Sequence, residues 1–127
     1  MTFYSRQVRK LKTQLYPRQD LTARIIKAKQ FIDSNYSEDI ELDSICREAY
    51  LSKFHFIRLF KKHYGRTPHQ YVTRVRVAKA KKLIGSGMTV RGACLAVGYN
   101  SLTSFSTLFK KMTGSSPSGY RKKSNSG

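Results

Sequence analysis

The sequence predicts an all-α fold of about seven helices, in which two similar two-helix units are joined by a long linker helix. Apolar residues recur at the three- and four-residue spacing of a helix, and no segment alternates well enough to require a strand. Residues that favour helix caps and turns divide the chain into short helical segments. One stretch of the chain also recurs later in related form, which indicates an internal duplication.

The first helix is predicted over residues 21–34, with Asp20 as its N-cap. Its apolar residues form one stripe at helical spacing: Leu21, Ile25, Ala28 and Ile32. The preceding residues, 1–19, are basic and have no sustained apolar period. We therefore interpret them as an N-terminal arm that is partly disordered.

The first two-helix unit is predicted over residues 42–64, as a short helix at 42–49 and a longer helix at 53–64. Ser52 is a favourable N-cap for the longer helix, and Gly65 supplies its C-terminal turn. The side chains expected to face inward are Leu42, Ile45, Cys46 and Ala49 on the short helix, and Phe56, Leu59, Phe60 and His63 on the longer one.

A long linker helix is predicted over residues 68–84. Thr67-Pro68 suits a cap followed by the first helical position, and Gly85-Ser86-Gly87 ends the helix. At a rise of ~1.5 Å per residue, a helix of this length extends about 25 Å. Its apolar period is continued by Tyr71, Val75, Ala78 and either Lys82 or Leu83.

The second two-helix unit is predicted over residues 90–113, as helices at 90–97 and 102–113. Their caps are Thr89 and Ser101, and the side chains expected to pack inward are Phe105, Leu108 and Phe109. Ser116-Pro117 then opens a last short helix to about residue 122. Residues 20–123 are expected to form one domain, followed by a flexible tail at 124–127.

The two units are related by duplication. Leu59-Phe60-Lys61-Lys62 recurs as Leu108-Phe109-Lys110-Lys111, a shift of 49 residues, whereas Cys46 corresponds to Cys94, a shift of 48. One residue has therefore been inserted in the second turn. Two helices joined by a tight turn have the form of a helix-turn-helix, whose second helix lies in the major groove of DNA. A helical repeat that binds protein is the alternative.

The charge of the chain is strongly asymmetric. Lys and Arg number 25 and Asp and Glu number 7, which gives a formal net charge of +18, and every acid lies between Asp20 and Glu48. Surfaces without a binding role usually mix both signs. The long stretch without a carboxylate favours a polyanionic partner, and predicts nucleic acid with an anionic membrane surface as the main alternative.

Catalytic, metal-binding and membrane-spanning functions are not predicted, and no cofactor is expected. Cys46 and Cys94 occupy equivalent inward positions and are interpreted as small core residues, in preference to a redox pair. The longest apolar run, residues 93–97, is far shorter than the ~20 residues of a membrane-spanning helix. The chain does not begin like a secretory signal, so we expect a cytoplasmic, nucleoid-associated protein. The histidines are spaced too widely to converge locally: His55, His63 and His69.

The tandem units and their turns resemble the DNA-binding domain of the AraC/XylS family of bacterial transcription regulators. The resemblance extends over residues 21–122, and it implies that both units bind double-stranded DNA. The chain is similar to the short, single-domain members of the family, which implies binding as a monomer, contact with RNA polymerase and activation of transcription. The most diagnostic stretch is Ala96-Val97-Gly98-Tyr99-Asn100-Ser101, followed by Phe105, Leu108-Phe109-Lys110-Lys111, Thr113-Gly114, Ser116-Pro117 and Tyr120-Arg121.

By this resemblance, the base-reading positions of the first unit fall on Phe54, Ile57 and Arg58. Arg58 can form two hydrogen bonds with a guanine edge, and the two apolar side chains can pack on thymine methyl groups. Packing in the core is the alternative role for Ile57. The residues expected to contact phosphates are Lys53, Lys61 and Lys62.

The second unit departs from the family pattern. Its outward side chains are expected to be Leu102, Thr103, Ser106 and Thr107, with Lys110 nearby. Thr107 stands where an Arg is common, and no residue of this set can make a bidentate contact with guanine. The first unit is therefore expected to carry most base discrimination, and the second to contribute phosphate, methyl and shape contacts.

A further departure lies in the first turn. Tyr50 stands where the family often has Gly, so this turn is expected to need a different backbone geometry.

The function predicted from these residues is sequence-specific DNA binding by a transcription regulator that is not an enzyme. A non-specific architectural or RNA-binding basic protein is the main competing function, and a cationic module that binds membrane surfaces is a second one. The combination of Arg58 and Phe54 on one helix face favours sequence-specific binding.

Overall fold

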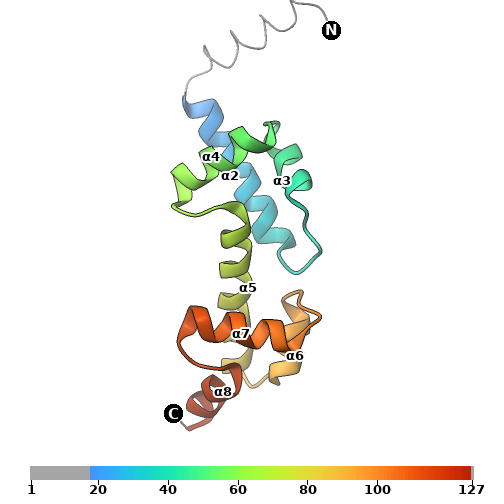
Figure 1. Ribbon diagram of the computed structural model, residues 1–127, viewed down its shortest axis with the longest axis vertical. Coiled ribbons are helices and arrows are strands. Elements are labelled where there is room, and N and C mark those ends of the chain that lie inside the picture. Colours follow the sequence, from blue (N-terminus) through green and yellow to red (C-terminus); the bar gives the residue numbers. More distant parts are fainter. Residues whose placement is uncertain (1–17, 127) are drawn as a thin grey trace, which may run out of the picture.

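The computed structural model describes residues 18–126, and within them it contains seven helices and no strand. Figure 1 shows an elongated molecule in which a central helix, α5 (Pro68–Gly85), connects two groups of helices. The first group contains α2 (Arg18–Asn35), α3 (Leu42–Ala49) and α4 (Lys53–Tyr64), and the second contains α6 (Val90–Ala96), α7 (Leu102–Thr113) and α8 (Pro117–Ser126). The predicted all-α fold, with two units joined by a long linker helix, is confirmed.

Side-chain caps fix where several of these helices begin. The Ser52 hydroxyl accepts a hydrogen bond from the backbone N–H of His55 at 3.4 Å, and Ser101 makes the equivalent bond in the second unit at 3.2 Å. Thr67 and Gln70 form a capping box at the start of α5, in which each side chain bonds to the backbone N–H of the other. These bonds satisfy N–H groups that the first turn of a helix leaves without a partner.

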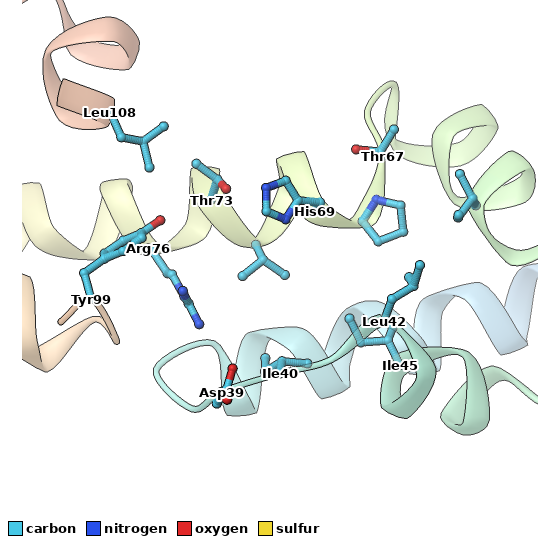
Figure 2. A pocket seen from close by; sticks show the side chains of 13 residues that line it. Asp39, Ile40, Leu42, Ile45, Thr67, His69, Thr73, Arg76, Tyr99 and Leu108 are labelled. Atoms are coloured by element: carbon cyan, nitrogen blue, oxygen red, sulfur yellow. The ribbon is translucent and has the colours of Figure 1, made fainter. Parts of the chain in front are cut away.

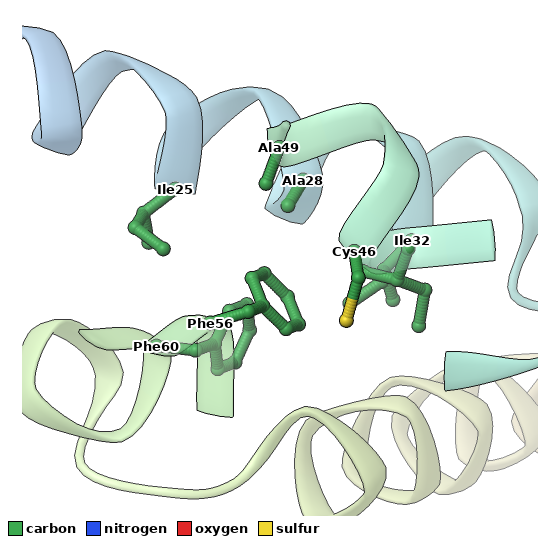
Figure 3. Close-up of a cluster of buried hydrophobic side chains, with 8 residues drawn as sticks. Ile25, Ala28, Ile32, Cys46, Ala49, Phe56 and Phe60 are labelled. Atoms are coloured by element: carbon green, nitrogen blue, oxygen red, sulfur yellow. The ribbon is translucent and has the colours of Figure 1, made fainter. Parts of the chain in front are cut away.

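The first group of helices encloses its own hydrophobic core (Figure 3). The aromatic rings of α4 fill its centre, and the ring of Phe60 also contacts Tyr64 and Tyr71 at centroid distances of 4.8 and 5.5 Å. The buried members of this core are Ile25, Ala28 and Ile32 of α2, Ile45, Cys46 and Ala49 of α3, and Phe56 and Phe60 of α4.

The second group encloses a separate core that repeats the first. The rings of Phe105 and Phe109 lie 5.7 Å apart at 52°, and those of Phe56 and Phe60 lie 5.6 Å apart at the same angle. The duplication seen in the sequence is therefore also present in the side-chain packing. The buried members are Val77, Ala80 and Ile84 of α5, Ala93, Cys94 and Val97 of the α6 segment, and Phe105 and Phe109 of α7.

Helix α5 contributes to both cores with different faces. Tyr71 and Val72 pack against the first core, whereas Val77 and Ile84 are buried in the second. The predicted single stripe through Ala78 is wrong, because Ala78 is exposed. The helix changes its packing partner halfway along, and its buried face rotates accordingly.

The ends of the described region differ from the prediction in two respects. Helix α2 begins at Arg18, so Asp20 is not an N-cap and instead forms an ion pair with Arg24 at 3.1 Å. Helix α8 continues through residues 124–126, which the sequence predicts as a tail, because no Gly or Pro lies between Tyr120 and Ser126 to end it. Residues 1–17 of the predicted arm lie outside the described residues.

The predicted inward position of His63 is also wrong, because this side chain is exposed. The neighbouring Tyr64 takes the inward place at the end of α4, where its ring contacts those of Phe60 and Tyr71. An aromatic cluster can accept the larger, less polar ring at this position more readily than an imidazole.

A second connection joins the two units besides α5. Arg76 of α5 donates hydrogen bonds to the backbone carbonyls of Tyr36, at 2.6 Å, and Glu38, at 2.8 Å, in the loop between α2 and α3. The same guanidinium lies 5.1 Å from the ring centroid of Tyr99 in the turn between α6 and α7. Tyr36 itself packs against the second core. We call this contact the interunit bridge, formed by Tyr36, Ser37, Glu38, Arg76, Gly98 and Tyr99.

We expect Phe109→Ala to reduce the stability of the second unit by about 3–5 kcal/mol, because it leaves a large cavity in a closed core. The two cores share no buried residue, so backbone amides of α3 and α4 should keep most of their protection against hydrogen exchange. Phe60→Ala is the matched variant and should give the reverse pattern. Equal loss of protection in both units of the Phe109 variant would contradict independent cores.

Candidate nucleic-acid interface

Helix α4 buries one face and exposes the other. Phe56 and Phe60 are fully buried, whereas Phe54 is 86% exposed and Arg58, one turn later, is also exposed. Because Phe54 and Arg58 are four residues apart, their side chains lie on one face of the helix. A large aromatic side chain beside an Arg on an open helix face is well suited to contact a partner.

Three lysines extend this exposed face of α4. Lys53, Lys61 and Lys62 are all exposed, and no α4 side chain forms an ion pair with another described residue. Because the chain has no carboxylate after Glu48, these cations are not neutralised by acids on their own helix. The face therefore carries net positive charge that a phosphate backbone can neutralise.

Ile57 differs from the other two predicted base-reading residues of α4. It is half-buried, packs against the first core, and lines a groove with a volume of about 480 Å³ between the two units. Figure 2 shows that Leu108 of α7 enters the same groove, with His69 and Thr73 of α5 along its floor. This position supports a packing role for Ile57, and leaves Phe54 as the apolar residue that is fully open to solvent.

Helix α7 presents an uncharged outer face. Leu102 is 42% exposed, Thr103 and Thr107 are exposed, and Ser106 is half-buried. The Thr107 hydroxyl donates a hydrogen bond to the backbone carbonyl of Thr103 at 3.0 Å, so its proton is engaged within the helix. The positive charge begins only at the exposed Lys110, two turns into α7.

The two candidate contact helices occupy equivalent places in the molecule. In Figure 1, α4 and α7 cross the long axis near opposite ends of α5, while α3 and α6 both lie to the right of α5. Each unit thus repeats the same arrangement relative to the linker. Base-contacting residues predicted in different units are not brought together into one site.

The turns of the two units share one backbone feature. A residue shortly after the first helix of each unit is left-handed: Tyr50 has φ 54° and ψ 39°, and Gly98 has φ 100°. The two turns are not identical, because Tyr50 directly follows α3 whereas Gly98 follows the C-cap Val97, so a different geometry of the first turn stays a prediction. Tyr50 adopts the left-handed conformation, which costs a residue with a Cβ about 1–2 kcal/mol. Tyr50 is 74% exposed, and the Lys27 ammonium lies 5.6 Å from its ring centroid.

The two cysteines are structural in this arrangement. Cys46 and Cys94 are buried, unpaired and in different cores, and burial raises the pKa of both thiols. Burial thus disfavours the reactive thiolate. Within residues 18–126, no group of three or more His, Cys, Asp or Glu side chains is placed to hold a metal ion. No helix in the same range is long and apolar enough to cross a membrane.

Comparison with known sequences agrees with this architecture. A family model described as a helix-turn-helix domain matches residues 45–123. The bifunctional transcriptional activator/DNA repair enzyme AdaA of Bacillus subtilis is 38% identical over 96 residues, which cover 75% of this chain and 46% of that protein. The raffinose operon transcriptional regulatory protein RafR of Pediococcus pentosaceus is 34% identical over 96 residues, covering 75% of this chain and 35% of that protein. The chain thus spans less than half the length of these curated relatives.

Solved structures show the same fold. The C-terminal domain of AraT, a response regulator from Geobacillus stearothermophilus, is 30% identical with a TM-score of 0.74, covering 79% of this chain and 84% of that one. The DNA-binding domain of AdpA, determined in complex with a target DNA, has a TM-score of 0.76 at 23% identity and covers 80% and 93% of the two chains.

Two helix-turn-helix units in tandem on one linker helix define a class of DNA-binding transcription regulators. This chain belongs to the AraC-type family of helix-turn-helix regulators.

We expect Tyr50→Gly to raise the free energy of unfolding by about 1 kcal/mol, because Gly adopts the left-handed conformation without the steric cost of a Cβ. Tyr50→Ala is the control, since it removes the ring but keeps the Cβ, and it should not stabilise the protein. Urea denaturation followed by circular dichroism measures both variants. A less stable Gly variant would mean that the Tyr50 ring contributes more than its backbone conformation costs.

Proposed function

We propose that this chain binds a specific site on double-stranded DNA as a monomer, with α4 and α7 in two successive major grooves. The observation that carries the proposal is the repetition of one two-helix arrangement at both ends of α5, with α4 and α7 in equivalent places. Helix α5 has 18 residues and is therefore about 27 Å long at ~1.5 Å per residue. A rod of this length is suited to hold two helices at grooves that recur every ~34 Å along one side of B-DNA.

In this binding mode, α4 supplies most of the base discrimination. Arg58 would form two hydrogen bonds with a guanine edge, and Phe54 would pack on a thymine methyl group. The exposure of both side chains supports these roles. Lys53, Lys61 and Lys62 would contact phosphates and fix the register of the helix without reading sequence.

Helix α7 would contribute in a different way, because its outer face carries no charge before Lys110. Leu102 and Thr103 would make apolar contacts with thymine methyl groups, and Ser106 and Thr107 would form weak hydrogen bonds through their hydroxyl groups. Lys110 would bind a phosphate. Sequence preference in this half of the site would then arise largely from DNA shape and flexibility.

We further propose that bound protein activates transcription by contacting RNA polymerase at the nucleoid in the cytoplasm, and that the chain has no catalytic role. The word activator in the name of AdaA, and the regulatory role in the name of RafR, support this direction. The repair activity in the name of AdaA belongs to a protein of which this chain covers 46%.

Selection of bound sites from a random duplex pool tests this function directly. The expected product is a motif with two half-sites about one helical turn apart, protected together in a footprint. Competition against random duplex should favour the motif by ~10³ or more. Protection of a single groove would contradict the two-groove mode. Equal binding of random DNA would instead indicate an architectural protein, preference for RNA an RNA-binding protein, and preference for anionic vesicles a module that binds membrane surfaces.

We expect Arg58→Ala to relax base preference at one position of one half-site, at a cost of ~1–3 kcal/mol in discrimination, because the bidentate contact is lost. Thr107→Ala, at the candidate surface of α7, is the comparison and should change preference much less. Affinities for all single-base variants of the selected site measure both effects. Equal relaxation at the two half-sites would contradict the unequal roles of α4 and α7.

Salt dependence should separate phosphate contacts from base contacts. Affinity is expected to fall ~10³–10⁵-fold between 50 and 200 mM salt if the protein makes ~6–10 phosphate contacts. Lys61→Ala should reduce the slope of log affinity against log salt by about 0.9 and weaken all sequences alike. Titrations at four salt concentrations measure the slope, and a change of sequence preference in this variant would assign Lys61 a base contact.

A further inference from the structure

We propose that Arg76 is a positioning residue that fixes the orientation of the two helix-turn-helix units, and thereby sets the spacing between half-sites that the protein accepts. This role rests on the proposed binding to two half-sites. Arg76 lies on α5, outside the exposed faces of α4 and α7, so it would influence DNA binding only through the geometry of the protein.

One end of the interunit bridge is the loop between α2 and α3. Arg76 holds this loop by two backbone carbonyls, those of Tyr36 and Glu38, at 2.6 and 2.8 Å. Tyr36 adds a second hold, because its ring packs against the core of the other unit, with the Lys79 ammonium 6.0 Å from its centroid. A loop that leads directly into the first unit is therefore anchored on the second.

The other end of the bridge is the turn between α6 and α7. The backbone of Gly98 approaches the loop so closely that a Cβ at this position would lie 2.8 Å from the Ser37 carbonyl oxygen and 3.3 Å from Cζ of Arg76. Gly98 also has a φ of 100°, a backbone conformation that a residue with a Cβ could adopt only with strain. Tyr99, the next residue, places its ring against the Arg76 guanidinium. The turn that orients α7 is thus pressed against the loop that precedes α3.

An arginine is suited to this position by its shape. The edge of the guanidinium carries N–H groups that reach both carbonyls, while its flat face remains available to the Tyr99 ring. A lysine would offer one point of charge and could not hold all three groups in the same geometry. The bonds go to main-chain carbonyls, so they define the path of the loop independently of its side chains.

The bridge changes the mechanical connection between the units. With α5 alone, bending of one helix would alter the angle between α4 and α7, and helices of this length do bend. A second attachment beside the helix closes a triangle between the loop, α5 and the turn. The units then keep one relative orientation, and a pair of half-sites with another separation would require distortion of the DNA or the protein.

The experiment compares Arg76→Gln with Arg74→Gln, which removes the same charge from an exposed position on the same helix. Affinities are measured for the selected site, for versions with the half-sites moved by one and two base pairs in each direction, and for each half-site alone. Arg76→Gln should lose about tenfold at the original spacing, as expected for hydrogen bonds of a charged group. Its preference for that spacing should nearly disappear, with single half-sites bound within about twofold of wild type. Arg74→Gln should keep the spacing preference.

A DNA-free measurement separates this proposal from the proposed function. Spin labels at cysteines introduced in place of His63 on α4 and Met112 on α7, both exposed, report the distance between the units by electron–electron resonance. Wild type treated with the same reagent controls for labelling of its two buried cysteines. The distance distribution should be narrow in the labelled protein that retains Arg76 and broad in the one that carries Arg76→Gln.

An unchanged distribution in Arg76→Gln, or an unchanged spacing preference, would overturn the positioning role. If wild type itself shows no spacing preference while Arg76→Gln broadens the distribution, the two-groove function fails and the structural part of the bridge stands. Should Arg76→Gln fail to fold, Gly98→Ala tests the same bridge from the turn, and Arg76→Lys tests it with the charge retained.

Discussion

Helix α5 is buried at its two ends in two different hydrophobic cores, and every other feature of the molecule depends on this division. Tyr71 and Val72 belong to the first core, and Val77 and Ile84 to the second, so the helix is both a structural member of each unit and the spacer between them. Its stability therefore comes from packing on both sides, which an isolated helix of this length would lack. The spacing of the units is a property of one continuous hydrogen-bonded element, to which Arg76 adds a lateral brace.

Core packing and the proposed DNA contacts use opposite faces of the same short helices. The paired phenylalanines of α4 and α7 have matching geometry inside, whereas the outer faces have diverged. One outer face combines Phe54 with Arg58 and lysines, and the other is built of hydroxyl and aliphatic groups. The two copies of the duplicated unit thus share their buried phenylalanines but differ in residues on their exposed faces. In the proposed binding mode, this asymmetry would give one chain two different contacts with DNA, whose base sequence can differ between half-sites although its phosphate backbone is regular.

The sequence predicts helix positions well because caps and apolar spacing are local signals. Ser52 and Ser101 mark the starts of α4 and α7 at the correct residues. The phenylalanines expected to face inward are buried as their spacing indicates: Phe56, Phe60, Phe105 and Phe109. Non-local effects could not be predicted in the same way. The buried face of α5 changes along the helix because the first half packs against one unit and the second half against the other. The hydrogen bonds of Arg76 could not be predicted either, because backbone carbonyls accept them and any residue type carries such a carbonyl. The outward direction of Phe54 and Arg58 follows from helix periodicity, but the half-buried position of Ile57 depends on the groove between the units.

The separation of the two cores has a consequence for how such a protein can diverge in evolution. A substitution on the outer face of one helix leaves the interior of the other unit untouched, so under the proposed binding mode each half-site could change in sequence without a compensating change in the other unit. The distance between the two units has less freedom, because the α2–α3 loop, helix α5 and the α6–α7 turn all contact the Arg76 guanidinium. We therefore expect related proteins with this arrangement to differ in the base sequences of their half-sites more readily than in the spacing between those half-sites.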